Sequence, residues 1–309
     1  MDEYIFTFAI VNWNTCELLD GCLASIRKYA GQYRYQVLVA DNDSSDGSVQ
    51  MVMRKYPEVV LCCNESNLGF ACAHECLFAM SKGRYHILVN SDVKLLPGCM
   101  DVIYRRMESQ PRIGILGPQI LDSENRIQPS CRGFPTLARQ LVEASGLNRL
   151  FPRLYPFSAY RMGHFDHREP CEVDQVMGSF FVIRRDLIKQ IGTLDNGFFM
   201  YYEEVDYCLR CHRAGYQVFF DPAAKVWHKG GGSAEKVKTL TIRRSMRSMR
   251  RYYEKHYGAW TQFPLMAIVS LELVTHAFFA LVTRRSFADS VKAYALGWWD
   301  VFRRRKANW

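Results

Sequence analysis

The chain has 309 residues, a length that suits one large α/β domain with an appendage. Hydrophobic residues make up 49% of it and charged residues 23%, which is the composition of a globular protein and excludes disordered and fibrous classes. Residues 236–309 carry 15 Lys and Arg against 4 Asp and Glu, whereas residues 1–235 carry 25 against 27. A basic C-terminal region of this kind favours an anionic partner, either membrane lipid or nucleic acid.

The 11 cysteines bear on the compartment and on metal binding. The first three residues, Met-Asp-Glu, precede only a short apolar run, so no secretory signal is predicted and we expect reduced thiols in a cytoplasmic protein. Cys208-Leu-Arg-Cys211-His212 has the spacing of a c-type haem attachment, but that chemistry requires export, so we expect both cysteines in the core. The cysteine cluster at residues 62–76 lacks the paired spacing of structural zinc sites.

Strands alternate with helices through the first ninety residues. Apolar runs rich in β-branched and aromatic residues predict the strands, and apolar residues at helical spacing predict the helices. The predicted strands are residues 4–12, 35–40, 59–63 and 85–89, and the predicted helices are residues 15–29, 48–56 and 70–81. This alternation is typical of βαβ units, so we predict an α/β fold with a mainly parallel sheet flanked by helices.

Two polar segments directly follow strands of that sheet. Asp41–Ser48 follows the second strand, and Asn90–Asp92 follows the fourth. Because ligands of open parallel sheets bind beyond the C-terminal ends of the strands, we expect a ligand site at this edge.

The middle of the chain has weaker patterns. Residues 129–170 contain five prolines and little periodicity, so we expect a long surface excursion with one helix near residues 137–145. The other predicted elements are a helix at 97–107, a strand with a hairpin at 113–127, a return to the sheet at 174–183 and a helix at 184–191.

One stretch, residues 198–232, gathers ionisable side chains. Three acids open a predicted helix that ends at Gly215, and acidic side chains in a first turn suit the helix dipole. Two short strands follow, separated by an Asp-Pro turn, and the second ends at His228 just before three glycines. The three acids are Glu203, Glu204 and Asp206.

The chain changes character after residue 235, where we predict a boundary between a domain of residues 1–235 and a basic helical region of residues 236–309. An arginine-rich helix is predicted at residues 239–257. The apolar run 263–282 is long enough to span a bilayer, but Glu272 near its middle makes spanning costly. We therefore expect a helix that packs on the domain or lies in the membrane interface. The tryptophans near the C-terminus also suit a membrane interface.

Asp92 and His228 are candidates for a metal site, since each lies at the end of a predicted strand. A carboxylate with an imidazole suits Mn²⁺ or Mg²⁺, and such an ion keeps positions open for phosphate and water. The sequence has neither a P-loop lysine motif nor a Gly-x-Gly-x-x-Gly after the first strand, which disfavours ATP hydrolysis and dinucleotide redox chemistry.

Together these motifs resemble the family 2 inverting glycosyltransferases of the GT-A fold, a Rossmann-like fold, and in particular the branch of rhamnosyl- and galactofuranosyltransferases. The resemblance covers roughly residues 5–232, with the motifs in family order. The matching segments are Ile10–Asn14, Val39–Ser48, Asn67–Phe70, Leu88–Asp92, Gly178–Arg185 and Phe198–Asp206, followed by Trp227-His228.

The resemblance implies a role for each matching position. Asp92 and His228 would hold the divalent metal at the donor's diphosphate, and Glu204 would be the general base. Asp41 would bind the uracil or thymine ring of a nucleotide-sugar donor. The other residues implied at the nucleotide-sugar are Asn12, Asn14, Asn67, Gly69, Phe70, Asn90 and Ser91, and those on the acceptor side are Gly178 and Ser179.

Two positions depart from the family pattern. Asn90 replaces the first acid of the family's Asp-x-Asp motif, and Glu204 stands where the base is commonly Asp. Glu203 and Asp206 therefore stay open as alternative bases, although Asp206 could instead pair with Arg210 at i+4.

The sequence thus predicts an inverting, metal-dependent hexosyltransferase that moves a sugar, rhamnose for example, from a dTDP or UDP donor to a hydroxyl of a lipid-linked glycan or polysaccharide. Inversion is expected because a single displacement needs one base, whereas a retaining double displacement needs a second carboxylate. We expect peripheral association with the inner face of the cell membrane. The alternative is a non-catalytic nucleotide-sugar or glycolipid binding protein; no nucleic acid partner is expected, because few aromatics interleave with the arginines.

Overall fold

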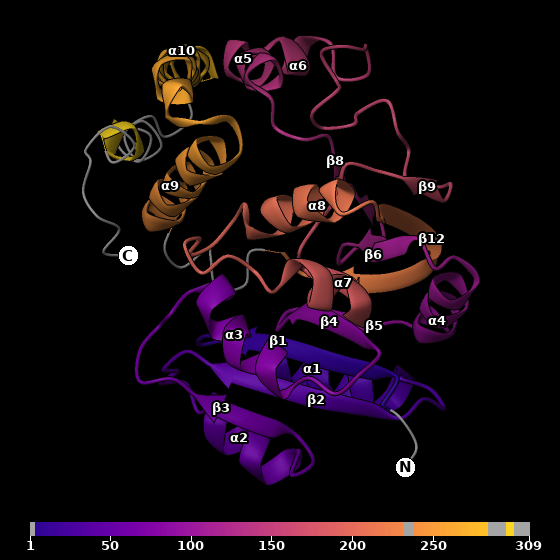
Figure 1. Cartoon of the computed structure of the whole chain (residues 1–309). Coiled ribbons are helices and arrows are strands. Elements are labelled where there is room, and N and C mark those ends of the chain that lie inside the picture. The colour runs from indigo at the N-terminus through magenta and orange to yellow at the C-terminus, as the bar shows by residue number, and fades with distance from the viewer. Residues whose placement is uncertain (1–3, 231–237, 284–294, 300–309) are drawn as a thin grey trace.

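The structure, a computed structural model, describes residues 4–230, 238–283 and 295–299. Its centre is a mixed sheet of ten strands with the main order β3-β2-β1-β4-β11-β6-β12-β5 (Figure 1). The strands of this order are β1 (Phe6–Asn12), β2 (Tyr35–Asp41), β3 (Val60–Cys63), β4 (Tyr85–Asn90), β5 (Val93–Leu95), β6 (Ile113–Leu121), β11 (Phe180–Arg184) and β12 (Gln217–His228). Four short strands complete the pairing: β7 (Ile127–Gln128) on β6, β9 (Cys171–Glu172) on β12, and β8 (Cys131–Arg132) with β10 (Gln175–Val176) in a separate ribbon.

Helices cover both faces of the sheet. Apolar residues of β1, β2 and β4 alternate between the faces, as the period of two in a strand requires, and each set packs on different helices. One face carries α1 (Cys16–Tyr29), α2 (Ser48–Lys55) and α4 (Cys99–Ser109). The other face carries α3 (Phe70–Met80), α7 (Arg185–Ile191) and α8 (Glu203–Arg213). Cys208 and Cys211 of α8 are buried in this second core, as predicted.

The strand directions confirm the predicted α/β fold with a mainly parallel sheet. β3, β2, β1 and β4 are parallel, β12 is parallel to β6, and β11 and β5 are antiparallel to their neighbours. Asn12 of β1 pairs with Asp41 of β2, and Val11 pairs with Asn90 of β4. The predicted polar segments therefore meet at one edge of the sheet.

The predicted turn at Asp221-Pro222 is wrong, because β12 continues through it. The strand forms a bulge between Asp221 and Lys225 and then resumes its pairing with β6. Asp221 holds the bulge by accepting a hydrogen bond of 3.1 Å from the backbone N–H of Ala223 and by pairing with Arg106 at 2.7 Å. The proline is thereby accommodated without ending the strand, as is usual at bulges.

The C-terminal helices pack on the rest of the chain. α9 (Lys238–Tyr257) and α10 (Gln262–Thr283) share a buried cluster with Phe198 and Val205, and α10 lies beside α5 (Leu137–Ser145), which α6 (Leu147–Leu150) follows (Figure 1). The prediction that the apolar run forms a helix packed on the domain is confirmed. None of the helices within the described ranges is both long enough and apolar enough to cross a membrane. The predicted boundary after residue 235 and the glycines 231–232 fall outside the described residues.

Candidate active site

The C-terminal ends of β1, β4 and β12 and the start of α8 surround a cavity of about 340 Å³. Most of the predicted site residues meet there, although they come from segments far apart in the sequence. Those that line the cavity are Asn67, Gly69, Phe70, Asn90, Ser91, Asp92, Gly178, Ser179, Glu203, Glu204 and His228. Asn12, Asn14, Asp41 and Asp206 are not among the lining residues.

Asp41 lies behind the cavity wall on the side of the predicted nucleotide site. Its Oδ2 accepts a hydrogen bond of 2.7 Å from the side-chain amide of Asn12, and its Oδ1 accepts one of 2.8 Å from the backbone N–H of Ser44. Asn14 accepts a bond of 2.8 Å from the backbone N–H of Ser45 in the same turn. These contacts fix the loop after β2, from which the next residue, Asn42, reaches the cavity.

Asp92 and His228 form a buried pair in the wall of the cavity. The pairing of β12 with β5 sets His228 opposite Val93, and this brings its Nε2 to 3.3 Å from Asp92 Oδ1. The other ring nitrogen, Nδ1, lies 2.8 Å from the amide oxygen of Gln128, an acceptor that favours a proton on Nδ1. With the proton on Nδ1, Nε2 and the Asp92 carboxylate form a donor pair whose chemistry suits a divalent cation, and Gln128 orients the imidazole.

The two glutamates enter the cavity from a strained turn. Tyr201 and Tyr202 both have φ of 68°, a left-handed backbone that tyrosine rarely adopts. Tyr202 is held there by aromatic packing on Tyr252 of α9, with the ring centroids 5.6 Å apart. The turn directs the first residues of α8, Glu203 and Glu204, into the cavity.

Burial makes both carboxyls weaker acids. Burial raises the pKa of Glu203 well above its ordinary value, and the neighbouring charge of Glu204 raises it further. Burial also raises the pKa of Glu204, although backbone N–H groups at the start of α8 oppose the shift. Glu204 is partly exposed, whereas Glu203 is only 5% exposed. A partly exposed carboxylate with a raised pKa suits general base catalysis.

Comparison with known proteins identifies the family. Residues 7–192 match the profile of glycosyl transferase family 2. This chain belongs to that family. It is 31% identical over 289 residues to the N-acetylglucosaminyl-diphospho-decaprenol L-rhamnosyltransferase of Mycobacterium tuberculosis, an alignment that covers 89% of this chain and 92% of the relative. The protein is therefore a nucleotide-sugar glycosyltransferase, as the sequence predicted.

Solved structures confirm the GT-A fold. The mannosyltransferase PcManGT of Pyrobaculum calidifontis, in complex with GDP-Man and Mn²⁺, superposes with a TM-score of 0.58 at 13% identity and covers 99% of this chain and 89% of its own. GalNAc-T7 with UDP, GalNAc and Mn²⁺ superposes with a TM-score of 0.57 at 15% identity, over 80% of this chain and 48% of its own. At these identities the likeness concerns the fold.

Several buried polar atoms of the glycosyltransferase have no partner and gather in this cavity. Native proteins leave few such atoms, so a cluster of them indicates a place for a polar ligand. Gly178 leaves room for the side chain of Glu204, because a Cβ at position 178 would lie only 3.3 Å from Cβ of Glu204. Among the described residues, the unpartnered atoms of the cavity lining are Ser179 Oγ, Glu203 Oε2, Glu204 Oε2 and Arg244 Nε.

Asp206, the third predicted acid, is fully buried in a cluster of cations outside the cavity lining. Its Oδ2 accepts from Arg210 at 2.8 Å, and its Oδ1 accepts from His256 at 2.7 Å and from Lys255 at 2.6 Å. Burial alone would raise the pKa of Asp206, but these hydrogen bonds and charges outweigh it and lower the pKa to about 2. Asp206 thus ties α8 to α9.

Replacing Asp206 by asparagine should lower the free energy of unfolding by about 3 kcal/mol at pH 7, because the partly buried Arg210 and Lys255 lose their buried counter-charge. Since the folded pKa lies below the ordinary value, the stabilisation is present above pH about 4 and is lost as pH falls toward 2. Urea unfolding of both proteins across this range checks the prediction. Asp186→Asn, which removes an exposed partner of Lys189, is the matched control and should change stability by less than about 0.5 kcal/mol.

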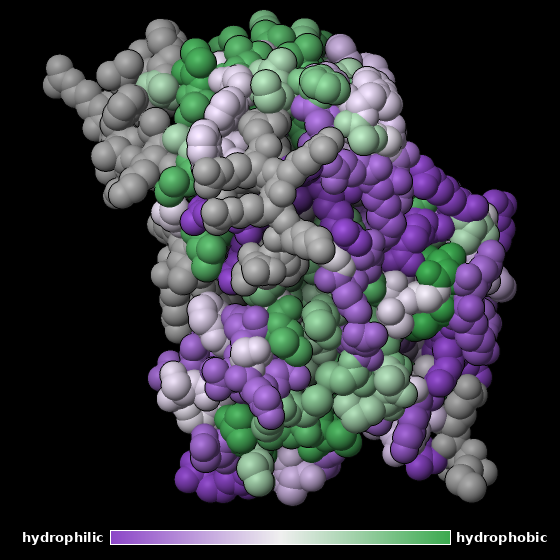
Figure 2. All heavy atoms as spheres, turned by 60° about the vertical axis from the view of Figure 1, so that its left-hand side comes forward, coloured by the Kyte–Doolittle hydropathy of each residue, from purple (hydrophilic) through white to green (hydrophobic). Residues whose placement is uncertain are grey.

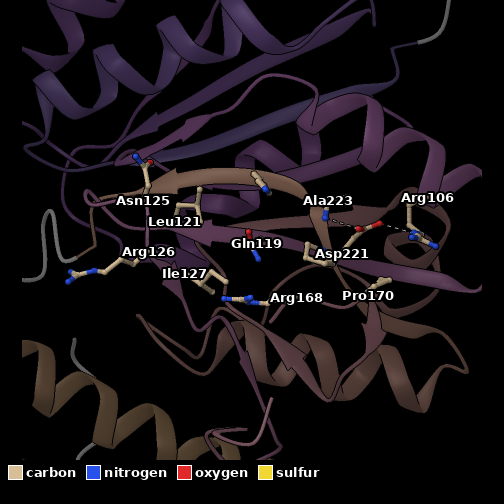
Figure 3. Close-up of a pocket in the computed structure, with 12 residues that line it drawn as sticks. Arg106, Gln119, Leu121, Asn125, Arg126, Ile127, Arg168, Pro170, Asp221 and Ala223 are labelled. Carbon is tan, nitrogen blue, oxygen red and sulfur yellow. Dashed lines mark hydrogen bonds and ion pairs between the residues drawn. The ribbon is translucent and has the colours of Figure 1, made fainter. Parts of the chain in front are cut away.

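A second cavity, of about 950 Å³, lies beside the β6–β12 pair and has a different chemical character (Figure 3). Arg106 and Asp221 form one end of it, and Asn125 and Arg126 lie at the other. Its single acidic lining residue, Asp221, is already engaged by Arg106 and by the bulge. Among its described lining residues this cavity offers no free carboxylate, and it does not include the C-terminal ends of β1, β4 and β12, so it does not compete as the donor site.

The sequence did not single out five residues that shape the transferase site. Trp13, Met177, Phe199 and Arg244 line the cavity, and Gln128 orients His228. Trp13 and Phe199 stand inside segments that carried the family resemblance, so that signal existed. Nothing local in the sequence indicates that Gln128 or Arg244 folds back to this edge of the sheet.

Proposed function

We propose that this glycosyltransferase moves a hexose, with inversion and with a divalent metal, from a dTDP- or UDP-sugar to a hydroxyl of a lipid-linked glycan or polysaccharide during cell-surface glycan assembly. The observation that carries the proposal is one cavity that combines an accessible carboxylate of raised pKa, Glu204, with the Asp92–His228 pair. Glu204 would serve as the base for the acceptor hydroxyl, and the Asp92–His228 pair would lie at the diphosphate of the donor.

The choice of substrates rests on the mycobacterial relative. Its name describes transfer of L-rhamnose to an N-acetylglucosaminyl-diphospho-decaprenol, and the alignment covers 89% of this chain. Rhamnose as the sugar and a polyprenyl diphosphate glycan as the acceptor are therefore the first substrates to test.

The residues of the cavity account for a single displacement. Asp92 and His228 would hold Mn²⁺ or Mg²⁺, which when bound supplies positive charge to the diphosphate leaving group. Glu204 takes the proton from the acceptor hydroxyl, while that oxygen bonds to the anomeric carbon and the bond from this carbon to the diphosphate breaks. Burial favours the neutral form of Glu203, which suits a positioning role better than that of a nucleophile.

A transfer assay tests the proposal. Purified protein with MnCl₂ is offered dTDP-rhamnose and UDP-sugars, with an N-acetylglucosaminyl-diphospho-lipid as acceptor, and the product's anomeric configuration is read by NMR. We expect an inverted glycosidic product and none in EDTA. Retained configuration would exclude the single displacement, and donor binding without any product would favour the non-catalytic alternative.

We also propose that the transferase docks on the membrane surface through the end of the molecule formed by α5, α6 and α10. Hydrophobic residues gather at this end (Figure 2). Phe263 of α10 is 79% exposed, and Tyr155, which follows α6, is 71% exposed. The other exposed large hydrophobic residues of these helices and of the segments next to them are Leu141, Leu150, Phe151, Leu154, Trp260, Met266 and Val274. Aromatic and aliphatic side chains of this kind, next to basic residues, suit a lipid interface.

The double variant Phe263→Ser, Tyr155→Ser should bind anionic vesicles at least about tenfold more weakly, because two apolar side chains no longer enter the interface. Co-sedimentation with phosphatidylglycerol vesicles measures the loss. Met53→Ser removes a residue of α2 that is 67% exposed at the other end of the molecule, and it should leave vesicle binding unchanged. Equal vesicle binding by all three proteins would refute this docking surface.

A further inference from the structure

One arginine of the basic C-terminal region reaches the donor cavity. Arg244 of α9 lines it, next to Thr241. We propose that Arg244 binds the diphosphate of the nucleotide-sugar donor and of the nucleoside diphosphate product. This inference rests on the proposed function and assigns to the C-terminal region a part of the donor site itself.

The position of Arg244 is fixed by an aromatic ring on the nucleotide side. Its guanidinium carbon lies 3.8 Å from the centroid of Phe199. The carbonyl of Phe199 in turn accepts a hydrogen bond of 2.6 Å from the backbone N–H of Phe70. Gly69 has φ of 82°, and a Cβ there would overlap the Phe199 carbonyl, so only glycine permits this close approach. Arg244 therefore stands over the loop predicted to hold the nucleotide.

Stacking on a ring leaves the edge of the guanidinium available. The N–H groups of arginine lie in the plane of the guanidinium, and their spacing matches two oxygens of a phosphate. Nε of Arg244 is buried and has no hydrogen-bond partner within the described part of the chain. The planar group is thus held in place while at least one of its donors awaits an acceptor.

Among the described residues, no carboxylate pairs with Arg244 to compensate its charge. Burial lowers its pKa, and the charge of Arg247 lowers it further, with no carboxylate opposing the shift within the described residues. Two other arginines of α9 do have acidic partners: Arg250 pairs with Glu254 at 2.9 Å and Arg251 pairs with Asp195 at 2.7 Å. An arginine kept half-buried without a counter-charge is typical of a site for an anion.

The electrostatics of the cavity explain why such a cation is needed. Three of its described lining residues are carboxylic acids, Asp92, Glu203 and Glu204, and Arg244 is the one Lys or Arg among them. A diphosphate that enters this acidic cavity needs positive charge beyond a single divalent ion. The acceptor hydroxyl carries no charge, so it does not call for this arginine.

The test compares Arg244→Met and Arg244→Lys with Arg250→Met, a matched loss of charge on the same helix. Calorimetry measures the binding of UDP and of dTDP in MnCl₂, and initial rates give KM for donor and acceptor separately. We expect Arg244→Met to weaken diphosphate binding and to raise the donor KM by about 10- to 100-fold, the range for a lost charge-assisted hydrogen bond. Arg244→Lys should lose less, and Arg250→Met should remain within twofold of the wild type.

The outcomes separate this inference from the function on which it rests. If the wild-type protein binds UDP or dTDP and Arg244→Met binds it equally well, the inference is overturned and the proposed function stands. A rise in the acceptor KM alone overturns it as well. If the wild-type protein binds neither diphosphate and transfers no sugar, the proposed function fails together with the inference. Thermal unfolding of each variant establishes that the fold is retained.

Discussion

The Asp92→Ala variant is expected to lose metal-dependent transfer by at least about a thousandfold. Asp92 is buried and its carboxylate lies 3.3 Å from the imidazole Nε2 of His228, so its removal leaves a single protein ligand. A divalent ion supplies several kcal/mol of stabilisation to a departing diphosphate, and a thousandfold loss corresponds to about 4 kcal/mol. Initial rates at a series of MnCl₂ concentrations measure the loss.

Graded variants around Asp92 separate loss of the ion from general damage. His228→Ala should lose about as much activity as Asp92→Ala, whereas Gln128→Leu should lose about 10- to 100-fold, because it only releases the orientation of the imidazole. High MnCl₂ should partly restore Gln128→Leu and should not restore Asp92→Ala. Asp186→Ala, which removes an exposed carboxylate from α7, serves as the matched control. Undiminished Mn²⁺-dependent turnover in Asp92→Ala would remove this residue from the metal site.

The sequence predicted the scaffold because its signals are local. Apolar strands such as residues 35–40 and amphipathic helices such as residues 15–29 carry their own periodicity, and their alternation determines a parallel sheet. The edge where Asp41 and Asn90 meet follows from that topology. The bulge at Asp221 was missed because an Asp-Pro pair is also typical of a turn, and its real partner, Arg106, lies 115 residues away in the chain.

Long-range packing determined the parts of the site that the sequence could not predict. Gln128 reaches His228 through the short β6–β7 hairpin, across 100 residues of sequence. Arg244 belongs to a helix whose arginines all look alike in the sequence, and its place in the cavity lining, stacked on Phe199, follows from the packing of α9. Asp206 illustrates the opposite case: its i+4 pairing with Arg210 was considered from the sequence, but its bonds to Lys255 and His256 required the placement of α9.

The Glu204→Gln variant is expected to lower kcat by about 10²- to 10⁴-fold while changing the donor KM only a few-fold. Glutamine has the same shape but cannot accept the proton of the acceptor hydroxyl, so the loss falls on the chemical step. Glu203→Gln should lower kcat much less, since Glu203 is the more buried of the two carboxyls. Single-turnover rates for the two variants, measured at saturating donor, compare them directly. A much larger loss of kcat in Glu203→Gln than in Glu204→Gln would assign the base to Glu203.

The dependence of kcat on pH gives a second test of the base. A general base acts when it is deprotonated, so kcat of the wild type should rise with pH through the pKa of Glu204. An ordinary glutamate titrates near pH 4.3. Burial raises the pKa of Glu204, so the rise in kcat should lie above that pH. Glu204→Gln should lose this rise and show a flat profile over the same interval. A rise of the same midpoint in the variant would assign the titration to another group.

The melting temperature of the Glu203→Gln variant distinguishes Glu203 from Glu204 independently of catalysis. The folded pKa of Glu203 lies well above its unfolded value, so the folded state holds a proton that the unfolded state releases as pH rises. Ionised Glu203 therefore opposes folding at neutral pH, and Glu203→Gln should raise the melting temperature there, with a gain that disappears as pH falls to about 4. Asp206 shows the opposite sign three residues later, because cations surround it. A destabilised Glu203→Gln protein at pH 7 would mean that the ionised carboxylate of Glu203 is stabilised in the folded state.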